Sequence, residues 1–178
     1  MRYIITLLAL AALSQPATDS SDNLPDDQSL VANGDFENGI NDWISKDAGM
    51  SEVKPEAAHR GELGLRVSDE DEQRGSSLGS RPAPATSGKT YLMRAWARVM
   101  SGKDASIHIQ FFDANNKQLT KKEFNNDILV KLKGGDWKLY TLRGVAPENA
   151  ATARVWIHTY NASKTILDVD DVTLHELK

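Results

Sequence analysis

Three short segments of the sequence alternate between small or aliphatic side chains and large aromatic or polar ones. Residues 92–99 and 153–160 follow this pattern, and residues 107–112 repeat it. Because successive side chains of a strand point to opposite faces, each segment would present one apolar face and one face of rings and hydrogen-bonding groups. The polar and aromatic faces comprise Arg94, Trp96, Arg98, His108, Gln110, Arg154, Trp156, His158 and Tyr160.

Aromatic rings bordered by planar hydrogen-bonding groups are suited to bind a sugar. A sugar ring has apolar C–H faces edged by hydroxyls, so it needs a ring to stack on and donors or acceptors beside it. If the three strands lie in one sheet, Trp96 and Trp156 could stack on the sugar. The three arginines favour an acidic glycan, because guanidinium pairs bidentately with carboxylate or sulfate. The alternative is that loops cover this face as a second core, or that the arginines pair with the acidic residues 69–72.

The composition indicates one globular domain. The chain has 178 residues, of which 40% are hydrophobic and 26% charged, and these values exclude a wholly disordered chain. A net charge of -4 disfavours nucleic acid as a partner, since phosphate binding needs a basic surface. The chain has no cysteine, which excludes disulfides, thiolate metal sites and a cysteine nucleophile.

The first residues resemble a secretory signal peptide. Arg2 precedes an apolar run at residues 3–13, and Ala12-Leu13-Ser14 fits a cleavage site with small residues at both ends. The run is too short to span a bilayer, and no later segment is long and apolar enough to do so. We therefore expect a signal peptide at 1–14, a flexible polar linker at 15–28 and one secreted domain at 29–178, in the extracellular space or the periplasm.

Short β-like runs separated by turn residues fill the rest of the chain, and no window after the apolar run keeps a helical period. Many short strands at regular spacing predict an all-β sandwich or jelly roll. The expected strands lie at residues 30–32, 50–53, 63–67, 76–80, 89–100, 105–113, 118–124, 136–143, 152–160 and 165–177.

Five motifs, in order along the chain, resemble carbohydrate-binding modules of families four, nine, sixteen and twenty-two. The opening motif is LVANGDFENG at 30–39, followed by Trp43, and the closing motif is ILDVDDVTL at 166–174. Between them come HRGELGLRV at 59–67, SGKTY at 87–91, and Trp137 with Pro147. The resemblance covers nearly the whole mature chain. It implies a jelly-roll sandwich of two antiparallel sheets, similar to galactose-binding-like domains, that binds glycans without cleaving them.

The resemblance also implies a structural calcium ion. Glu37 and Asp171 fall on ligand positions of these modules, and backbone carbonyls around Asp35 and at Arg60 or Glu62 would add further oxygens. Calcium takes six to eight oxygen ligands, so this mixture is suitable. One ion held by these residues would tie the beginning of the domain to its end.

Three acidic residues near the end of the chain independently favour a cation. Asp168, Asp170 and Asp171 are so close in sequence that their mutual repulsion favours a cation or exposure to solvent. By strand alternation Asp168 and Asp170 share a face, while Asp171 points toward the interior with Val169. A buried carboxylate needs a partner, and plain hydrogen bonding is the alternative to calcium.

The sequence therefore predicts a secreted, non-catalytic protein that binds a polysaccharide or oligosaccharide, with an acidic glycan as one candidate. The first alternative is a small jelly-roll polysaccharide lyase, in which Arg94 would neutralise a uronate while His158 and Tyr160 transfer protons. The usual lyase segments are not evident, and about 150 residues are few for such an enzyme. The second alternative is a structural or adhesive extracellular domain whose aromatic face is buried against another protein.

Overall fold

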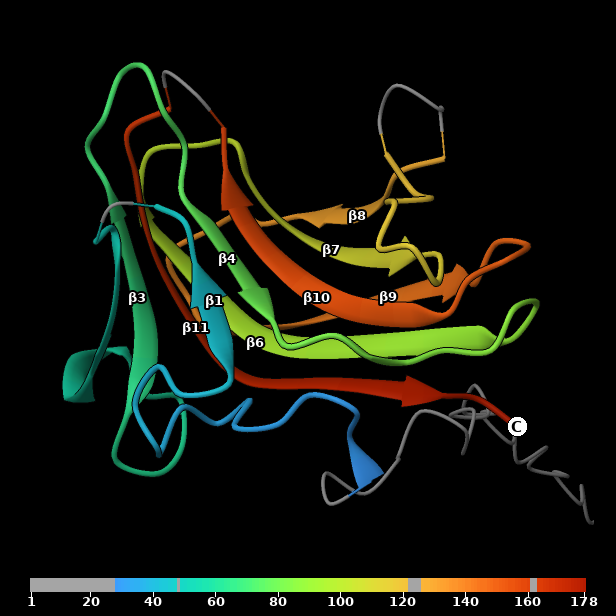
Figure 1. Cartoon of the computed structure of the whole chain (residues 1–178). Coiled ribbons are helices and arrows are strands. Elements are labelled where there is room, and N and C mark those ends of the chain that lie inside the picture. The colour runs from blue at the N-terminus through green and yellow to red at the C-terminus, as the bar shows by residue number, and fades with distance from the viewer. Residues whose placement is uncertain (1–27, 48, 122–125, 161–162) are drawn as a thin grey trace, which may run out of the picture.

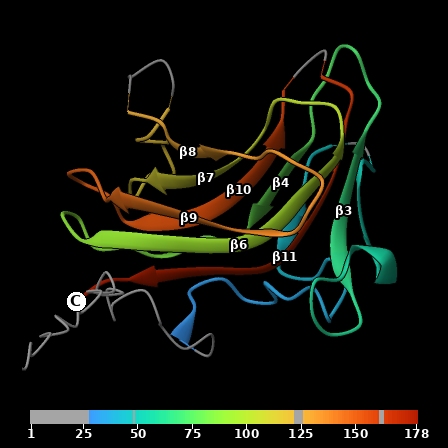
Figure 2. The same ribbon diagram turned by 180° about the vertical axis from the view of Figure 1, so that it is seen from behind.

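Two antiparallel sheets face each other across a shared core (Figures 1 and 2). The computed structural model describes residues 28–47, 49–121, 126–160 and 163–178. The first sheet, called sheet A, contains in spatial order β1 (Trp43–Ser45), β4 (Ser77–Ser80), β10 (Thr152–Thr159), β7 (Ala105–Phe112) and β8 (Ile128–Lys131), and β5 (Ala83–Pro84) also pairs with β10. Sheet B contains β2 (Ser51–Lys54), β3 (Gly64–Asp69), β11 (Thr165–Glu176), β6 (Thr90–Ser101) and β9 (Lys138–Val145).

The apolar faces predicted from strand alternation form this core. On β6 the core residues are Met93, Ala95, Ala97 and Val99, on β7 they are Ile107, Ile109 and Phe111, and on β10 they are Ala153, Val155 and Ile157. All of them are buried, because removing apolar surface from water is the main favourable term in folding. The fold class predicted from the sequence is confirmed.

The condition that the three aromatic strands lie in one sheet is not met. β6 lies in sheet B between β11 and β9, whereas β10 lies in sheet A between β4 and β7. Both strands turn their apolar face into the same core, so their other faces leave the sandwich on opposite sides. Alternation reveals which face of a strand is buried, but it does not reveal the sheet to which the strand belongs.

Some expected strands differ from the observed ones. Residues 30–32 form a bend that leads into a turn and no strand, although the Leu30 N–H donates to the Leu174 carbonyl at 2.7 Å. Residues 118–121 contribute only an isolated bridge, Gln118 with Phe112, and residues 122–125 lie outside the described part of the chain. The strand beside β7 is instead β8, and the short strands β1, β5 and β8 were not predicted.

A β-bulge changes the direction of Asp171. The pairing of β11 with β6 shifts between Asp170 and Thr173, and Asp171 has a φ of 51°, in the left-handed region. Val172 therefore takes the inward position, with 1% of its surface exposed, so the expectation that Asp171 points inward is wrong. Asp168 and Asp170 lie on the outer side of sheet B, and both are fully buried by the segments that cover it.

Within the described residues, no helix is long and apolar enough to cross a membrane. The predicted signal peptide at 1–14 and all of the predicted linker except Gln28 lie outside the described residues.

Candidate functional site

The outer face of sheet A gathers the predicted residues of β7 and β10. Cross-strand pairing places Trp156 opposite His108 and Arg154 opposite Gln110. The structure therefore brings together six of the nine residues predicted to contact a glycan, namely His108, Gln110, Arg154, Trp156, His158 and Tyr160.

A hollow of about 300 Å³ opens on this face. It is lined by His108, Gln110, Gln118, Lys121, Asp127, Trp156, His158 and Tyr160. Sequence reasoning missed Gln118, Lys121 and Asp127, which come from the chain between β7 and β8. These residues belong to no alternating segment, so no periodic signal could have marked them.

The Trp156 ring is held in one orientation by its neighbours. Its indole stacks on the His158 ring at a centroid distance of 4.2 Å and an interplanar angle of 16°. The His108 ring lies 4.8 Å away, tilted by 50°. The indole Nε1 donates a hydrogen bond to Ser77 Oγ at 2.9 Å. A ligand that stacks on this half-buried ring would therefore not have to order it first.

One row of outward-facing positions crosses sheet A at the level of Trp156. The pairing registers place Ile44, Gly79, Trp156, His108 and Leu129 side by side on successive strands. Because neighbouring strands lie about 4.8 Å apart, this row spans about 19 Å. A Cβ atom at Gly79 would lie 3.3 Å from Arg154 Nη1, so the missing side chain leaves room for the guanidinium.

The side chain of Arg154 is held by contacts within the domain. Its Nε donates to Gln110 Oε1 at 2.8 Å, and its guanidinium lies 4.9 Å from the centre of the Phe112 ring. Burial lowers the pKa of Arg154 below its usual value. These contacts fix the guanidinium beside the row of outward-facing positions that contains Trp156.

Both histidines of the hollow favour the neutral imidazole. Burial lowers the pKa of His108 below its ordinary 6.5, although the nearby Asp127 carboxylate acts in the opposite direction. Burial also lowers the pKa of His158, with the Ser76 carbonyl acting in the opposite direction. His108 Nδ1 lies 3.1 Å from Asp127 Oδ1, and His158 Nδ1 lies 2.5 Å from the Ser76 carbonyl oxygen.

Arg94, Trp96 and Arg98 lie on the outer face of sheet B, away from this hollow. The Trp96 ring stacks on the ring of His59, with a centroid distance of 4.0 Å and an interplanar angle of 15°. His59 belongs to the segment between β2 and β3, residues 55–63, which covers the outer face of sheet B. Arg98 donates to Asp168 Oδ2 and to the Glu56 carbonyl, both at 2.8 Å. Trp96 and Arg98 therefore attach a covering segment to sheet B.

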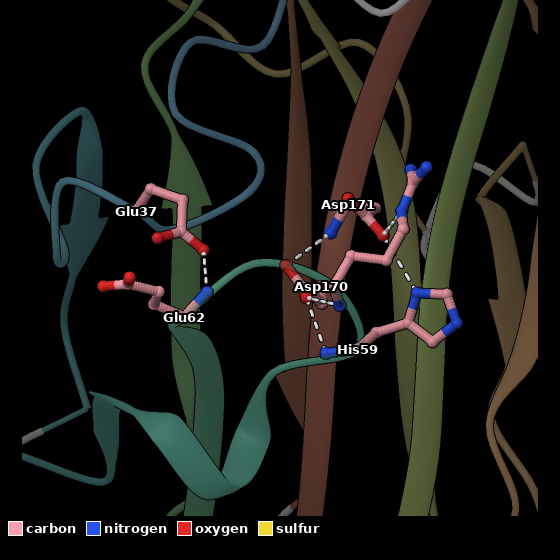
Figure 3. A network of polar contacts seen from close by, with 6 residues as sticks. Glu37, His59, Glu62, Asp170 and Asp171 are labelled. Carbon is pink, nitrogen blue, oxygen red and sulfur yellow. Dashed lines mark hydrogen bonds and ion pairs between the residues drawn. The ribbon is translucent and has the colours of Figure 1, made fainter.

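Four of the five predicted calcium ligands line a second hollow, of about 440 Å³, on the sheet B side. These residues are Asp35, Glu37, Arg60 and Asp171. Glu37 Oε1 accepts hydrogen bonds from the N–H groups of Glu62 at 2.8 Å and Leu63 at 3.1 Å. Figure 3 shows Glu37 directed toward this turn, with the side chain of Glu62 pointing away from it.

The carboxylates of Asp170 and Asp171 are also met by nitrogen donors (Figure 3). Asp170 Oδ2 accepts from the N–H groups of His59 at 2.7 Å and Arg60 at 3.1 Å. Asp171 Oδ2 lies 2.9 Å from Arg60 Nε and 3.0 Å from His59 Nδ1. Burial raises the pKa of Asp170 to about 6, against the lowering effect of the backbone N–H groups of His59, Arg60 and Asp171.

This arrangement does not fit a preformed calcium site. Calcium needs oxygen ligands, whereas the Asp171 carboxylate is occupied by a guanidinium and an imidazole. Across the described ranges, no group of three or more His, Cys, Asp or Glu side chains could hold a metal ion. The hydroxyl of Thr173 lines the hollow without a hydrogen-bond partner, but a single hydroxyl does not complete a calcium shell. The ion stays a prediction, and the contacts observed between the two ends of the domain are direct hydrogen bonds.

Comparison with known proteins identifies the family. Residues 28–164 match the family model described as "Carbohydrate binding domain". The chain belongs to this carbohydrate-binding domain family. No curated protein matches the sequence.

Solved carbohydrate-binding domains share the fold at low sequence identity. A family 16 carbohydrate-binding module is 23% identical, with a TM-score of 0.63 over 82% of this chain and 98% of the other. A family 61 module in complex with β-1,4-galactotriose is 18% identical, with a TM-score of 0.55 over 83% and 98% of the two chains. A xylan-binding domain from Paenibacillus barcinonensis is 11% identical, with a TM-score of 0.54 over 76% and 86%.

In this carbohydrate-binding domain the opening motif serves the fold. The Asn33 side chain donates to the carbonyls of Gly39 at 3.0 Å and Asn41 at 2.7 Å, which closes the loop. Phe36 is fully buried and stacks on Trp43 at 5.1 Å. A Cβ atom at Gly34 would lie 1.9 Å from the Val172 carbonyl oxygen, so only glycine allows this approach. None of these residues lines the sheet A hollow.

The Glu37 contact predicts a loss of stability when its carboxylate is removed. We expect Glu37→Ala to lower the free energy of unfolding by about 1–2 kcal/mol, because two N–H groups of the turn lose a charged acceptor. Glu62→Ala is the matched control, since the Glu62 side chain is exposed and only its backbone N–H takes part. Urea denaturation measures both. Equal stability of the two variants would contradict the role of Glu37.

A chelator that lowers the melting temperature of the wild type would reveal an ion, and the hydrogen bonds alone predict no change.

The two buried histidines predict a dependence of stability on pH. Their pKa values are lower in the folded state than the unfolded value of about 6.5. Their contribution to stability is therefore complete above pH about 6.5 and is lost as the pH falls through the folded pKa values. We expect NMR titration of the ring signals of His108 and His158 to give midpoints below 6.5, and a midpoint above 6.5 for either ring would contradict this assignment.

Proposed function

We propose that this domain binds a polysaccharide or oligosaccharide in the hollow of sheet A without cleaving it. The observation that carries the proposal is the fixed Trp156 ring, which lies in a row of outward residues beside hydrogen-bonding groups. An aromatic ring with polar groups around it matches the apolar faces and hydroxyl edges of a sugar. Two similar structures support a glycan chain as the ligand, since one is a xylan-binding domain and the other holds β-1,4-galactotriose.

The row supports binding of several sugars within one chain. It runs across the strands from Ile44, which is 39% exposed, through Trp156 to Leu129. A length of about 19 Å is more than one sugar ring needs. We therefore propose that the domain recognises a stretch of a glycan chain lying across β4, β10 and β7.

The arrangement does not favour the lyase alternative. A lyase of the expected kind would need Arg94 beside His158 and Tyr160, but Arg94 extends from β6 on the opposite face of the sandwich. Ser106, His108 and Asp127 are connected in the order of a catalytic triad, with Ser106 Oγ 2.8 Å from His108 Nε2 and Asp127 at the other ring nitrogen. A hydrolase is nevertheless disfavoured. Ser106 is fully buried and could not reach a substrate.

We also propose that the domain is secreted, on the basis of the signal-like residues 1–14. The structural or adhesive alternative shares this location and differs in its partner. A glycan array with neutral and acidic glycans separates the two, because a protein-binding domain would leave the array blank.

Two tryptophans on opposite faces provide a matched pair of variants. We expect Trp156→Ala to abolish the retardation of the protein in gels that contain a bound polysaccharide, with the fold retained. Trp96→Ala should leave the retardation unchanged but lower the free energy of unfolding by about 2 kcal/mol, because it removes the stacking partner of His59. Affinity electrophoresis and thermal melting measure the two effects. Loss of retardation in Trp96→Ala with the fold intact, or normal retardation in Trp156→Ala, would place the ligand elsewhere.

A further inference from the structure

A chain of hydrogen bonds runs under one end of the sheet A hollow, from β7 to the residue before β8. Ser106 Oγ lies 2.8 Å from His108 Nε2, and His108 Nδ1 lies 3.1 Å from Asp127 Oδ1. Ser106 is fully buried and His108 is 2% exposed, whereas the Asp127 side chain is 21% exposed. Only Asp127 among the three can therefore contact a ligand to a useful extent.

The chemistry of the three groups fixes where the hydrogens lie. A neutral imidazole carries one N–H, and an ionised carboxylate can only accept. The hydrogen of His108 must therefore be on Nδ1, directed at Asp127, and Nε2 accepts from the Ser106 hydroxyl. His108 thus holds Oδ1 of Asp127, a residue that lines the hollow, and this contact does not use the other carboxylate oxygen.

His158 on the neighbouring strand has the same tautomer for the same reason. Its Nδ1 faces the Ser76 carbonyl, which can only accept, so this nitrogen carries the hydrogen. In the neutral ring the other nitrogen, Nε2, is then an acceptor. His158 lines the hollow together with Asp127, and the rings of His108 and His158 have their centroids 6.4 Å apart.

We propose that Asp127 and His158 form an acceptor site at this end of the hollow, which binds the hydroxyls of an uncharged sugar and rejects carboxylate or sulfate groups. This inference rests on the proposed glycan-binding function and deepens it. Asp127 is the specificity-determining residue, and His108 and Ser106 are positioning residues that act through it. Two adjacent sugar hydroxyls can donate to such acceptors, whereas an anionic substituent would face a negative charge.

The charges around the hollow agree with this assignment. The acidic glycan expected from the sequence depended on three arginines, of which Arg94 and Arg98 extend from the other sheet. Arg154 is already bonded to Gln110 and does not line the hollow. Among the residues that the structure describes, Lys121 is the one cation that lines the hollow, and it has an interaction of its own.

The variant Asp127→Asn tests the site directly. The asparagine carbonyl can still accept from His108 Nδ1, but an NH2 donor replaces the free oxygen. We expect the affinity for the bound neutral chain, with xylan and β-1,4-galactan as probes, to fall about tenfold. Affinity for polygalacturonate and alginate should rise relative to the wild type. Asp136→Asn is the control, because Asp136 is exposed, lies outside the hollow and gives the same change in net charge.

NMR of the histidine rings tests the positioning role. In the wild type we expect Nδ1 of both His108 and His158 to carry the hydrogen. Asp127→Asn should shift the His108 Nδ1 signal, and Asp136→Asn should not. A neutral His108 ring with its hydrogen on Nε2 would overturn the inference whatever the stability of the variants.

The outcomes separate this inference from the function on which it rests. If the wild type binds neither neutral nor acidic glycans on an array, both fail. If the wild type binds glycans but prefers polygalacturonate or alginate, or if Asp127→Asn behaves like Asp136→Asn, the acceptor site is wrong and glycan binding stands.

Discussion

The shared core between the two sheets is the constraint on which the location of the site depends. Each long strand turns one face inward, because the apolar side chains of β6, β7, β10 and β11 fill a single core. The remaining faces must therefore leave the sandwich in opposite directions. Residues with the same pattern, such as Trp96 and Trp156, consequently serve different surfaces. The outer face of sheet B, with Trp96, is covered by other segments of the domain. The outer face of sheet A, with Trp156, carries the hollow.

The covered surface explains why arginine and tryptophan occur on β6. Asp168 is fully buried there and accepts two hydrogen bonds from Arg66, at 2.7 and 2.9 Å, in addition to that from Arg98. A buried carboxylate without partners would be strongly destabilising, so both arginines are required by the fold. Arg98 also lies 4.7 Å from the centre of the Trp137 ring, and His59 packs between Trp96 and Trp137. The segment that covers β6 is thus attached by the ring contacts of His59 and by the hydrogen bond from Arg98 to the Glu56 carbonyl.

The sequence predicted the parts of the fold that depend on local order. Alternation along residues 92–99 and 153–160 correctly identified the buried faces, since it follows from the geometry of a single strand. The assignment of strands to sheets was out of reach, because β6 and β10 are more than fifty residues apart and both have the pattern of a half-buried strand. Asp171 was misplaced because a bulge adds one residue to the period of two. Asp127 was missed because its position is set by the register of β8 on β7, which has no signature in the sequence.

The residues of the opening motif and the residues that line the sheet A hollow are different sets with different roles. Residues of the opening motif, such as Asn33, Gly34 and Phe36, close loops and fill the core. Changing them would damage packing, so they carry information about the architecture and none about the sugar. Residues such as Gln118 and Asp127 line the hollow from the segment between β7 and β8, and their side chains are not part of the core. The choice of ligand can therefore change through this segment and the outward positions of β7 and β10 while the sandwich is preserved. For this reason the identity of the glycan must be argued from the donors and acceptors of the hollow itself.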